Sequence, residues 1–190
     1  MSIIESLEKR RTRYSLTKDL PVPEEKVLET IKRVAELSPD AFDCRSGRLI
    51  VLLGEENDRF WDMVIGTFDP PIADYKQACF RGSYGTILYF YENDVVEALE
   101  NKFELFRPYF QGWAMQASAM VQMNIWSALA DLGVGASLHH YNPVIDDAVK
   151  EMYGLPASWK FIAQMPFGGL ADDPRVKDPD DIEARVFVRR

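Results

Sequence analysis

The spacing of hydrophobic residues predicts that helices make up much of this chain. Five apolar residues at positions i, i+1, i+4, i+7 and i+8 give one face of a helix: Val27, Leu28, Ile31, Val34 and Ala35. Ser2 and Glu5 match a capping box, so a first helix is expected from there to about Arg11. Further helices are expected over residues 55–65, 94–103 and 112–132, and from an Asn142-Pro143 start signal to Gly154.

Runs of β-branched and aromatic residues predict short strands between these helices. Residues 48–53 are expected to form a buried strand, because an apolar run of five residues follows Arg48. The other expected strands cover residues 86–91, 134–139, 159–165 and 182–188, whereas residues 67–82, with Pro70-Pro71, are expected to be irregular. Strands scattered among more numerous helices predict an α+β fold, a central sheet with helices packed on it, in one domain spanning residues 1–190.

Residues 112–130 carry no charge, so a membrane-spanning helix has to be weighed against a buried one. Five polar side chains interrupt the stretch: Gln116, Ser118, Gln122, Asn124 and Ser127. These polar residues argue against a membrane span, and a central helix buried in a folded protein is the better interpretation.

The composition is that of a folded, acidic protein. Of 190 residues, 47% are hydrophobic, which is enough for a sizeable core, and the net charge is −8. A negative field repels phosphodiester backbones, so nucleic-acid binding is not expected. Cys44 and Cys79 provide no disulfide framework or metal-ligand pair, and residues 1–5 lack the features of a signal peptide. We therefore expect a cytoplasmic protein with reduced thiols and no membrane partner.

A basic cluster interrupts this acidic sequence where the first helix is expected to end. It comprises Lys9, Arg10, Arg11, Thr12 and Arg13. Such a cluster is commonly a solvated surface. The alternative is an anion site, because two guanidinium groups and a hydroxyl can hold a phosphate in bidentate fashion. The residues alone leave both interpretations open.

Two further segments carry polar groups between the expected elements. The loop of residues 42–46 contains Asp43, Cys44 and Arg45, and its simplest interpretation is a polar turn. His139 and His140 are neighbours on an expected strand, so their side chains should point to opposite faces and cannot easily share one metal ion. The sequence contains no glycine-rich phosphate loop and no nucleophile-elbow motif.

Motifs along almost the whole chain occur in the order expected for one known family. They include Arg10-Arg11-Thr12, Ser38-Pro39, Trp61-Asp62, Tyr84-Gly85-Thr86, Gly133-x-Gly135-Ala136, His140-Tyr141-Asn142-Pro143, Trp159-Lys160 and Ala163-Gln164-Met165-Pro166-Phe167-Gly168. In this ordered set the chain resembles the FMN-dependent nitroreductases, and in particular their short subgroup named for the fungal fatty-acid-repression-mutant proteins. The resemblance implies the nitroreductase-like fold, a central mixed sheet flanked by helices, in a domain-sharing homodimer.

The resemblance also implies which residues form a site for FMN. Those expected at the phosphate are Arg10, Arg11, Thr12 and Lys177, assisted by Arg175. Those expected around the isoalloxazine ring are Leu138, His139 and His140, whose backbone would flank N5, with Asp43 at N3–H and Arg13 or Arg45 toward N1. Cations at that edge stabilise the charge of a reduced flavin.

For activity, the resemblance implies an NAD(P)H-dependent oxidoreductase that reduces nitroaromatic or quinone-like small acceptors by a ping-pong mechanism. NADH or NADPH would reduce FMN and leave before the acceptor binds. Two chains would line each flavin site. The helix over residues 112–132 would form much of their interface, since its stripe is too apolar for the surface of a small monomer. No side chain need act as acid or base, so no catalytic residue is assigned.

Three residues depart from the subgroup's pattern, and all three are expected at the ring. Asp43 and Arg45 stand where asparagine and glutamine are typical, and His139 stands where glutamine is typical. An ionised Asp43 can only accept hydrogen bonds and would disfavour the reduced, anionic flavin, an effect that Arg45 would partly offset. Two other functions therefore stay open: a flavin-binding redox-stress or lipid-metabolism regulatory protein with little turnover, and a dimer that has lost flavin.

Overall fold

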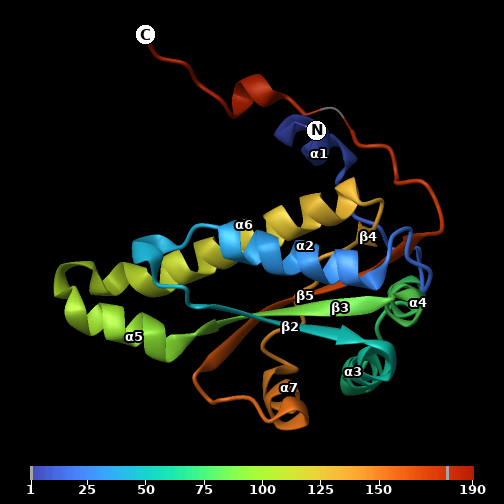
Figure 1. The fold of residues 1–190 in the computed structure, drawn as a ribbon, viewed down its shortest axis with the longest axis horizontal. Coiled ribbons are helices and arrows are strands. Elements are labelled where there is room, and N and C mark those ends of the chain that lie inside the picture. The colour runs from blue at the N-terminus through green and yellow to red at the C-terminus, as the bar shows by residue number, and fades with distance from the viewer. Residues whose placement is uncertain (1, 179) are drawn as a thin grey trace.

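The computed structural model describes residues 2–178 and 180–190, and Figure 1 shows that a central sheet has helices on both faces. On one face lie α2 (Glu24–Leu37) and α6 (Phe110–Asp131), and on the other lie α3 (Gly54–Thr67) and α7 (Asp146–Tyr153). The remaining helical elements are α1 (Ile3–Lys9), α4 (Asp74–Gly82), α5 (Asn93–Lys102), and the short 3-10 helices η1 (Ala41–Asp43), η2 (Glu104–Tyr109) and η3 (Ile182–Ala184).

Five strands form the sheet: β1 (Leu16–Thr17), β2 (Gly47–Leu53), β3 (Gly85–Glu92), β4 (Gly135–Ala136) and β5 (Trp159–Leu170). Their order is β1-β5-β3-β2, with β4 also paired to β5, and these ladders are antiparallel. A parallel pairing is made by the bridge between Thr12 and Ala136. The predicted fold class, a central sheet flanked by helices in an α+β arrangement, is confirmed.

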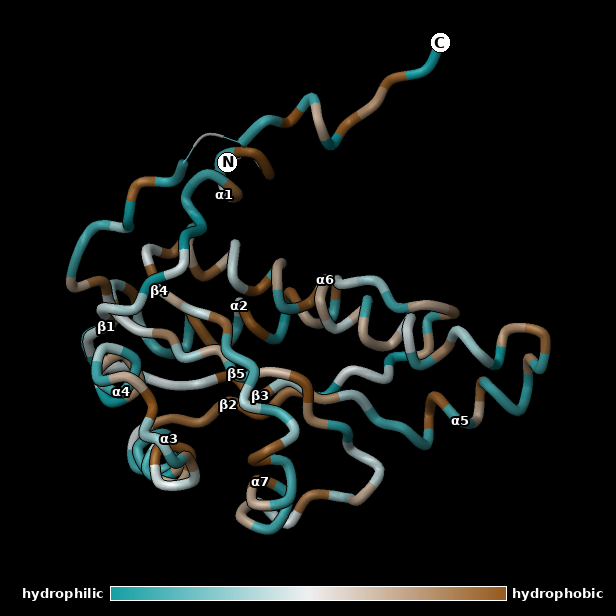
Figure 2. Tube along the Cα trace, turned by 180° about the vertical axis from the view of Figure 1, so that it is seen from behind, coloured by the Kyte–Doolittle hydropathy of each residue, from teal (hydrophilic) through white to brown (hydrophobic). Residues whose placement is uncertain are grey.

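The core has two halves because helices cover the sheet on both faces. Alternate residues of β3 point to opposite sides, so Ile87 and Tyr89 pack with α2 and α6 while Leu88 and Phe90 pack with α3 and α7. A strand covered on both faces is apolar throughout, which explains why residues 86–90 are all buried. Figure 2 shows the same hydrophobic strands between more mixed helices.

The uncharged helix predicted over residues 112–132 is α6, and its polar residues are accommodated inside the fold. Ser118, Gln122 and Ser127 are buried, and Gln122 Nε2 donates to Ser118 Oγ at 2.9 Å. Gly133 ends the helix with φ of 78°. Within residues 2–178 and 180–190, no helix combines the length and apolar character needed to cross a membrane.

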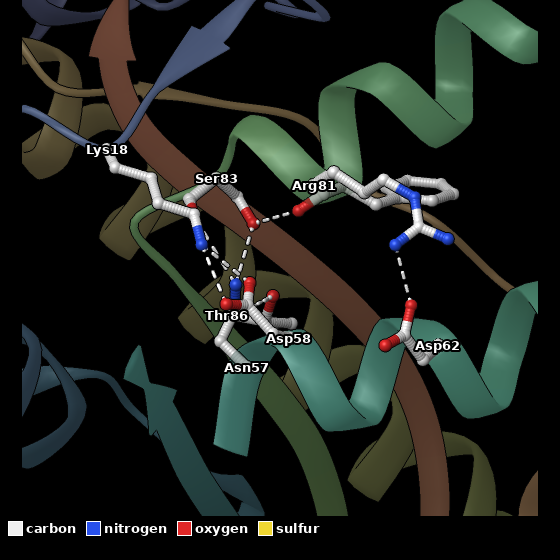
Figure 3. A network of polar contacts seen from close by, with 8 residues as sticks. Lys18, Asn57, Asp58, Asp62, Arg81, Ser83 and Thr86 are labelled. Atoms are coloured by element: carbon white, nitrogen blue, oxygen red, sulfur yellow. Dashed lines mark hydrogen bonds and ion pairs between the residues drawn. The ribbon is translucent and has the colours of Figure 1, made fainter. Parts of the chain in front are cut away.

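A buried polar network joins α3 to α4 and β3 (Figure 3). The Asn57 carboxamide donates to Ser83 Oγ at 3.1 Å and accepts from Thr86 Oγ1 at 2.6 Å. Trp61 Nε1 donates to the same Thr86 oxygen at 2.7 Å. These side chains are at most 1% exposed, and their hydrogen bonds offset the cost of burying polar groups.

Most of the predicted elements are present. The capping box of Ser2 and Glu5 starts α1, and the predicted helices over residues 27–35, 55–65 and 94–103 correspond to α2, α3 and α5. The predicted strands over residues 86–91 and 159–165 correspond to β3 and to a longer β5. Local periodicity therefore located the elements that have one clear apolar face or a continuous apolar run.

One helix was missed and the start of another was predicted wrongly. Residues 74–82 form α4 and are not irregular, since Cys79 and Phe80 bury one face of the segment after the prolines. Helix α7 begins at Asp146, with Ile145 at the N-cap, and not at Asn142-Pro143. The Asn142 side chain is committed elsewhere, because it accepts from Gln164 Nε2 and donates to Asp146 Oδ1.

Three strand predictions also need correction. β2 lies at the free edge of the sheet, so it is only half buried, with Leu52 as its one buried residue. Of residues 134–139, only Gly135–Ala136 form a strand, and His139 adds a single bridge to Gln164. Residues 182–188 do not pair with a strand of their own chain: η3 lies at 182–184, and the segment runs out past α1, away from the sheet (Figure 1).

Candidate active site

The basic cluster of residues 9–13 is held against the sheet by its backbone. Thr12 forms a bridge with Ala136, and the Arg13 N–H donates to the Ala136 carbonyl at 3.0 Å. In an extended backbone successive side chains point to opposite sides. Arg11 lines a cavity of about 440 Å³ beside α6, Thr12 and Tyr14 line a second cavity of about 410 Å³, and Arg13 lies between the two and lines both.

Arg10 is half-buried and packs on α6. Its guanidinium carbon lies 4.5 Å from the centre of the Trp126 ring on α6, a cation–π contact. Its Nε is buried and has no hydrogen-bond partner. Burial and the neighbouring Arg11 both lower the pKa of Arg10. An unpartnered buried donor beside a second cation fits a group that binds an anion, so the phosphate role predicted for this cluster is compatible with the structure.

The chain after β5 returns to the basic cluster. Arg11 donates to the carbonyl of Arg175, and Arg13 donates to the carbonyl of Asp172 at 2.9 Å. Arg175 lines the 410 Å³ cavity together with Thr12. Lys177 is exposed two residues further on. Arg175, predicted from the far end of the sequence, therefore lies against Arg11 and shares a cavity with Thr12, although Arg11 and Thr12 line different cavities.

The segment predicted to flank a flavin ring, residues 138–140, lies beside β5. His139 is 6% exposed and His140 is exposed, as expected for neighbours that point to opposite sides. The His139 ring hydrogen-bonds Ser137 Oγ at 2.9 Å and lies 6.0 Å from the Tyr14 ring. Burial lowers the pKa of His139 to about 4, and Lys76 and His140 add to this effect. His139 is therefore neutral at physiological pH.

The polar loop, residues 40–46, adopts an unusual backbone. Phe42, Asp43 and Arg45 all have positive φ, between 50° and 57°, a conformation that costs free energy for any residue except glycine. Asp43 and Arg45 are exposed and pair with each other at 2.9 Å. That ion pair raises the pKa of Arg45. Strained loops of this kind cluster at functional sites, which favours a binding role over a simple polar turn.

The two free cysteines are poor nucleophiles in this environment. Burial raises the pKa of Cys79 to about 11, and it also raises the pKa of Cys44 in the polar loop. Both thiols are therefore protonated at neutral pH, and reactivity depends on the thiolate.

The predicted site residues form two groups on opposite edges of the sheet. His139 lies along the outer edge of β5 and Thr12 and Arg13 lie beside β4 at the same side of the sheet, whereas Asp43 and Arg45 precede β2 at the far edge. Three interstrand spacings of about 4.8 Å separate these edges. Asp43 and Arg45 line a different cavity, of about 390 Å³, between the polar loop, α2 and α6. One chain alone does not bring the two groups together.

Three residues near this site were not singled out from the sequence. Tyr14 and Tyr75 both line the 410 Å³ cavity, and their rings meet edge to face at 5.7 Å. Gln164 is fully buried behind the 138–140 segment. A glutamine inside the apolar run of β5 is a signal in its own right, because a buried carboxamide needs partners. The tyrosines gave no comparable signal.

Comparison with known sequences points to one family. The sequence model described as the nitroreductase family matches residues 7–169. The HBN1 protein of Saccharomyces cerevisiae is 30% identical over 187 residues, which cover 97% of this chain and 96% of that protein. The nitroreductase FRM2 of the same yeast is 29% identical over 170 residues, with 87% and 86% covered.

Comparison with solved structures agrees. Nitroreductase CinD from Lactococcus lactis, solved in complex with chloramphenicol, superposes with a TM-score of 0.94 at 40% identity, and 100% of both chains is covered. The same protein in complex with 4-nitrophenol gives a TM-score of 0.93 at 40% identity, again over 100% of both chains.

Proposed function

The chain belongs to the nitroreductase family, and from that premise we propose that it is an NAD(P)H-dependent FMN oxidoreductase that reduces nitroaromatic or quinone-like acceptors by a ping-pong mechanism. The similarity to FRM2 confirms the predicted subgroup, and an oxidoreductase of the nitroreductase type follows from the family. The finer proposal rests on one observation: the basic cluster and the 138–140 segment are held side by side on β5 and β4.

The residues present fit FMN. Arg10 offers an unpartnered buried donor, and nearby in the chain Thr12 lines the 410 Å³ cavity together with Arg175. In the proposed site these groups and Arg11 hold the phosphate, with exposed Lys177 supplying a further cation. Arginine keeps its positive charge when partly buried, so the proposed contacts with the phosphate persist across the physiological pH range.

Bound FMN would supply the hydride acceptor and donor of the reaction. The backbone of Leu138, His139 and His140 flanks the ring near N5 in this proposal. Neutral His139 adds no charge there, and its ring is fixed by Ser137 and by contact with Tyr14. Arg13 of one chain or Arg45 of the other stabilises negative charge at the N1 edge, and Asp43 accepts from N3–H.

We propose that the working unit is a homodimer in which each site takes residues from both chains. The separation of Asp43 and Arg45 from Thr12 and His139 supports this, since a second copy can deliver the missing group. Exposed hydrophobic side chains provide the surface: Ile3, Ile4 and Leu7 of α1, Met115 and Met120 of α6, and Val186, Phe187 and Val188 of the C-terminal segment. In the dimer, residues 182–188 would pair with the partner's sheet as the predicted fifth strand.

Subunit complementation tests the shared site. Arg11→Glu, which repels the phosphate, and Arg45→Trp, which fills the ring end of the site, are each meant to inactivate a different half of a site, so a mixed dimer has one intact site and one doubly damaged site. Where both parent variants are inactive, random exchange of equal amounts leaves about a quarter of all sites intact, and activity should recover to roughly that fraction of wild type. Mixtures no more active than the two separate variants would contradict a site built from two chains.

A flavin-binding regulator of redox stress or lipid metabolism with little turnover is the second candidate, and the exposed Asp43 carboxylate favours it because negative charge at the ring opposes reduction. Under either function we propose a cytoplasmic location, and the two free cysteines support it because disulfides are rare in that compartment.

The visible spectrum of the purified protein under anaerobic conditions separates these functions. The proposed reductase has a flavin band near ~450 nm that NADH or NADPH bleaches and that returns when 4-nitrophenol is added. A band that resists both donors would support the regulator. If no band appears, even after incubation with FMN, the proposed cofactor is wrong.

A further inference from the structure

The carboxamide of Gln164, in the middle of β5, is fully buried. Both of its polar atoms hydrogen-bond to the neighbouring segment of residues 141–142. Its Oε1 accepts from the backbone N–H of Tyr141 at 3.0 Å, and its Nε2 donates to Asn142 Oδ1 at 2.9 Å. Its backbone exchanges two hydrogen bonds with His139, at 2.8 and 2.9 Å. Asn142 in turn donates to Asp146 Oδ1 at 2.7 Å, at the start of α7.

This set of contacts replaces a strand ladder that the chain does not form. Between the end of β4 and the start of α7, the single β-bridge to β5 among the described residues is the one between His139 and Gln164. The Gln164 side chain extends that bridge by three residues, as far as Asn142. Without it the Tyr141 N–H would lose its acceptor, and a backbone donor away from water without a partner is costly.

The position requires a carboxamide in particular. Oε1 has to accept from a backbone N–H while Nε2 donates to the Asn142 oxygen, and both atoms belong to one planar group. An ionised carboxylate could make only the first of these contacts, and an aliphatic side chain could make neither. Gln164 is 0% exposed, so bulk solvent does not reach these groups to replace the lost contacts.

The imidazole ring of His139 is also held in place, by aromatic residues of the core. Its ring packs edge to face on Phe80 at 4.9 Å between ring centres, and Phe80 stacks on Trp61 at 3.8 Å. The side-chain position of His139 is therefore set by the core, while the path of the backbone after it is set by Gln164. These two constraints leave residues 138–140 with one well-defined backbone.

We propose that Gln164 is a positioning residue: by holding residues 139–142, it sets the distance and orientation of the 138–140 backbone toward N5 of the flavin. Gln164 acts through this segment and does not touch the cofactor. The inference rests on the proposed function, because it assigns Gln164 a task at the flavin site.

A pair of matched variants tests it. Gln164→Met keeps the volume of the side chain and removes both of its hydrogen bonds. Asn57→Leu is the control, because Asn57 is also a buried carboxamide with hydrogen bonds to three atoms, in the network of Figure 3, and none of them reaches residues 138–142. Both variants are expected to lower the melting temperature, so a loss of stability alone does not distinguish them.

Two readouts distinguish a positioning role from a structural one. In the protein without FMN, the Tyr141 amide should exchange with deuterium roughly tenfold faster in Gln164→Met and at the wild-type rate in Asn57→Leu. In the FMN-loaded protein, Gln164→Met should shift the midpoint potential and the visible circular dichroism of the flavin, while Asn57→Leu leaves both unchanged. The affinity for FMN should stay near wild type in both, since the phosphate contacts are intact.

If Gln164→Met does not fold, Asn142→Ala takes its place, because it removes one of the same contacts from a half-buried side chain; a smaller shift in the same direction is expected. A flavin potential and dichroism equal to wild type in the folded variant, or an equal shift in Asn57→Leu, overturns the inference. Wild-type protein that takes up no FMN overturns the proposed function and this inference together, and it is recognised before any variant is made.

Discussion

The 138–140 segment and the polar loop of residues 40–46 are both expected at the flavin ring, yet their construction differs. His139 is buried, hydrogen-bonded and enclosed by aromatic rings, whereas Asp43 and Arg45 are exposed and contact mainly each other. The first segment gains its shape from the core of its own chain. The second holds three residues at positive φ with little packing around two of them, which suggests a surface prepared for a partner.

The largest expected effect tests how far the core supports the 138–140 segment. Trp61→Ala removes a side chain that is 1% exposed, stacks on Phe80 and donates to Thr86. Replacing a buried aromatic with alanine costs about 3–5 kcal/mol, and the free energy of unfolding should fall by that amount in chemical denaturation. The packing beneath His139 should loosen as well.

Phe42→Ala is the comparison for that variant, because Phe42 is an aromatic residue of the polar loop and is 49% exposed. It packs on Phe103 and Trp113 from the solvent side, so its loss should cost less than about 1.5 kcal/mol in the same measurement. Equal losses for the two variants would mean that the loop is as much a part of the core as the 138–140 segment.

The buried His139 should make the free energy of unfolding depend on pH, by about 3 kcal/mol between pH 7 and pH 4. The pKa of His139 is about 4 in the folded protein, against about 6.5 for a free histidine, so the unfolded chain binds the extra proton first. The stabilisation from neutral His139 is complete above pH 6.5 and is lost progressively as the pH falls to 4. His139→Gln should flatten the stability profile in that range when unfolding is followed at several pH values.

His140→Gln provides the matched control, since His140 is exposed and next to His139. Its stability profile between pH 7 and 4 should follow wild type. If His139→Gln kept the full wild-type slope, the acid sensitivity would have to come from carboxylates elsewhere and not from the buried ring.

The contrast between the two segments also explains what could be predicted from the sequence. Elements with one apolar face, such as α2, or a continuous apolar run, such as β3, were located because burial determines their pattern. The edge strand β2 looked buried because local sequence does not record a strand's place in the sheet. Residues 182–188 have the composition of a strand, but none of the described strands pairs with them, and composition does not record whether a pairing edge is present.

The site followed the same division. The conjunction of Arg11, Thr12 and Arg175 was expected only from the resemblance, since residues 164 positions apart have no periodicity in common. The separation of Asp43 from His139 required the strand order, which no spacing in the sequence reveals. Gln164 could have been noticed as a polar residue in an apolar strand, although its partners could not.

In the proposed site, the contact between Arg11 of the basic cluster and the FMN phosphate should contribute a factor of about 10–100 to the FMN affinity. Arg11→Ala removes a guanidinium from the basic cluster, and a charge-assisted hydrogen bond typically contributes about 1.5–3 kcal/mol. Fluorescence titration of the flavin-free protein with FMN measures the effect. Lys9→Ala carries the same change of charge one residue outside the predicted set, and it should change the affinity far less; a similar loss in both variants would indicate only a general attraction to a cationic surface.

The smallest expected effect concerns the polar loop, where the charges largely cancel. In the proposed site Asp43 opposes negative charge on the reduced flavin, so Asp43→Asn should raise the midpoint potential and Arg45→Gln should lower it. Exposed charges several ångströms from the ring change the energy by about 1 kcal/mol, or roughly 20 mV for a two-electron couple. Asp58→Asn, an exposed carboxylate in a different ion pair, is the control for a redox titration. Because Asp43 and Arg45 pair with each other, the double variant should return close to the wild-type potential. If Asp43→Asn produced no upward shift in the midpoint potential, the polar loop would lie away from the ring. The exposed, strained loop would then serve dimer formation and not the flavin site.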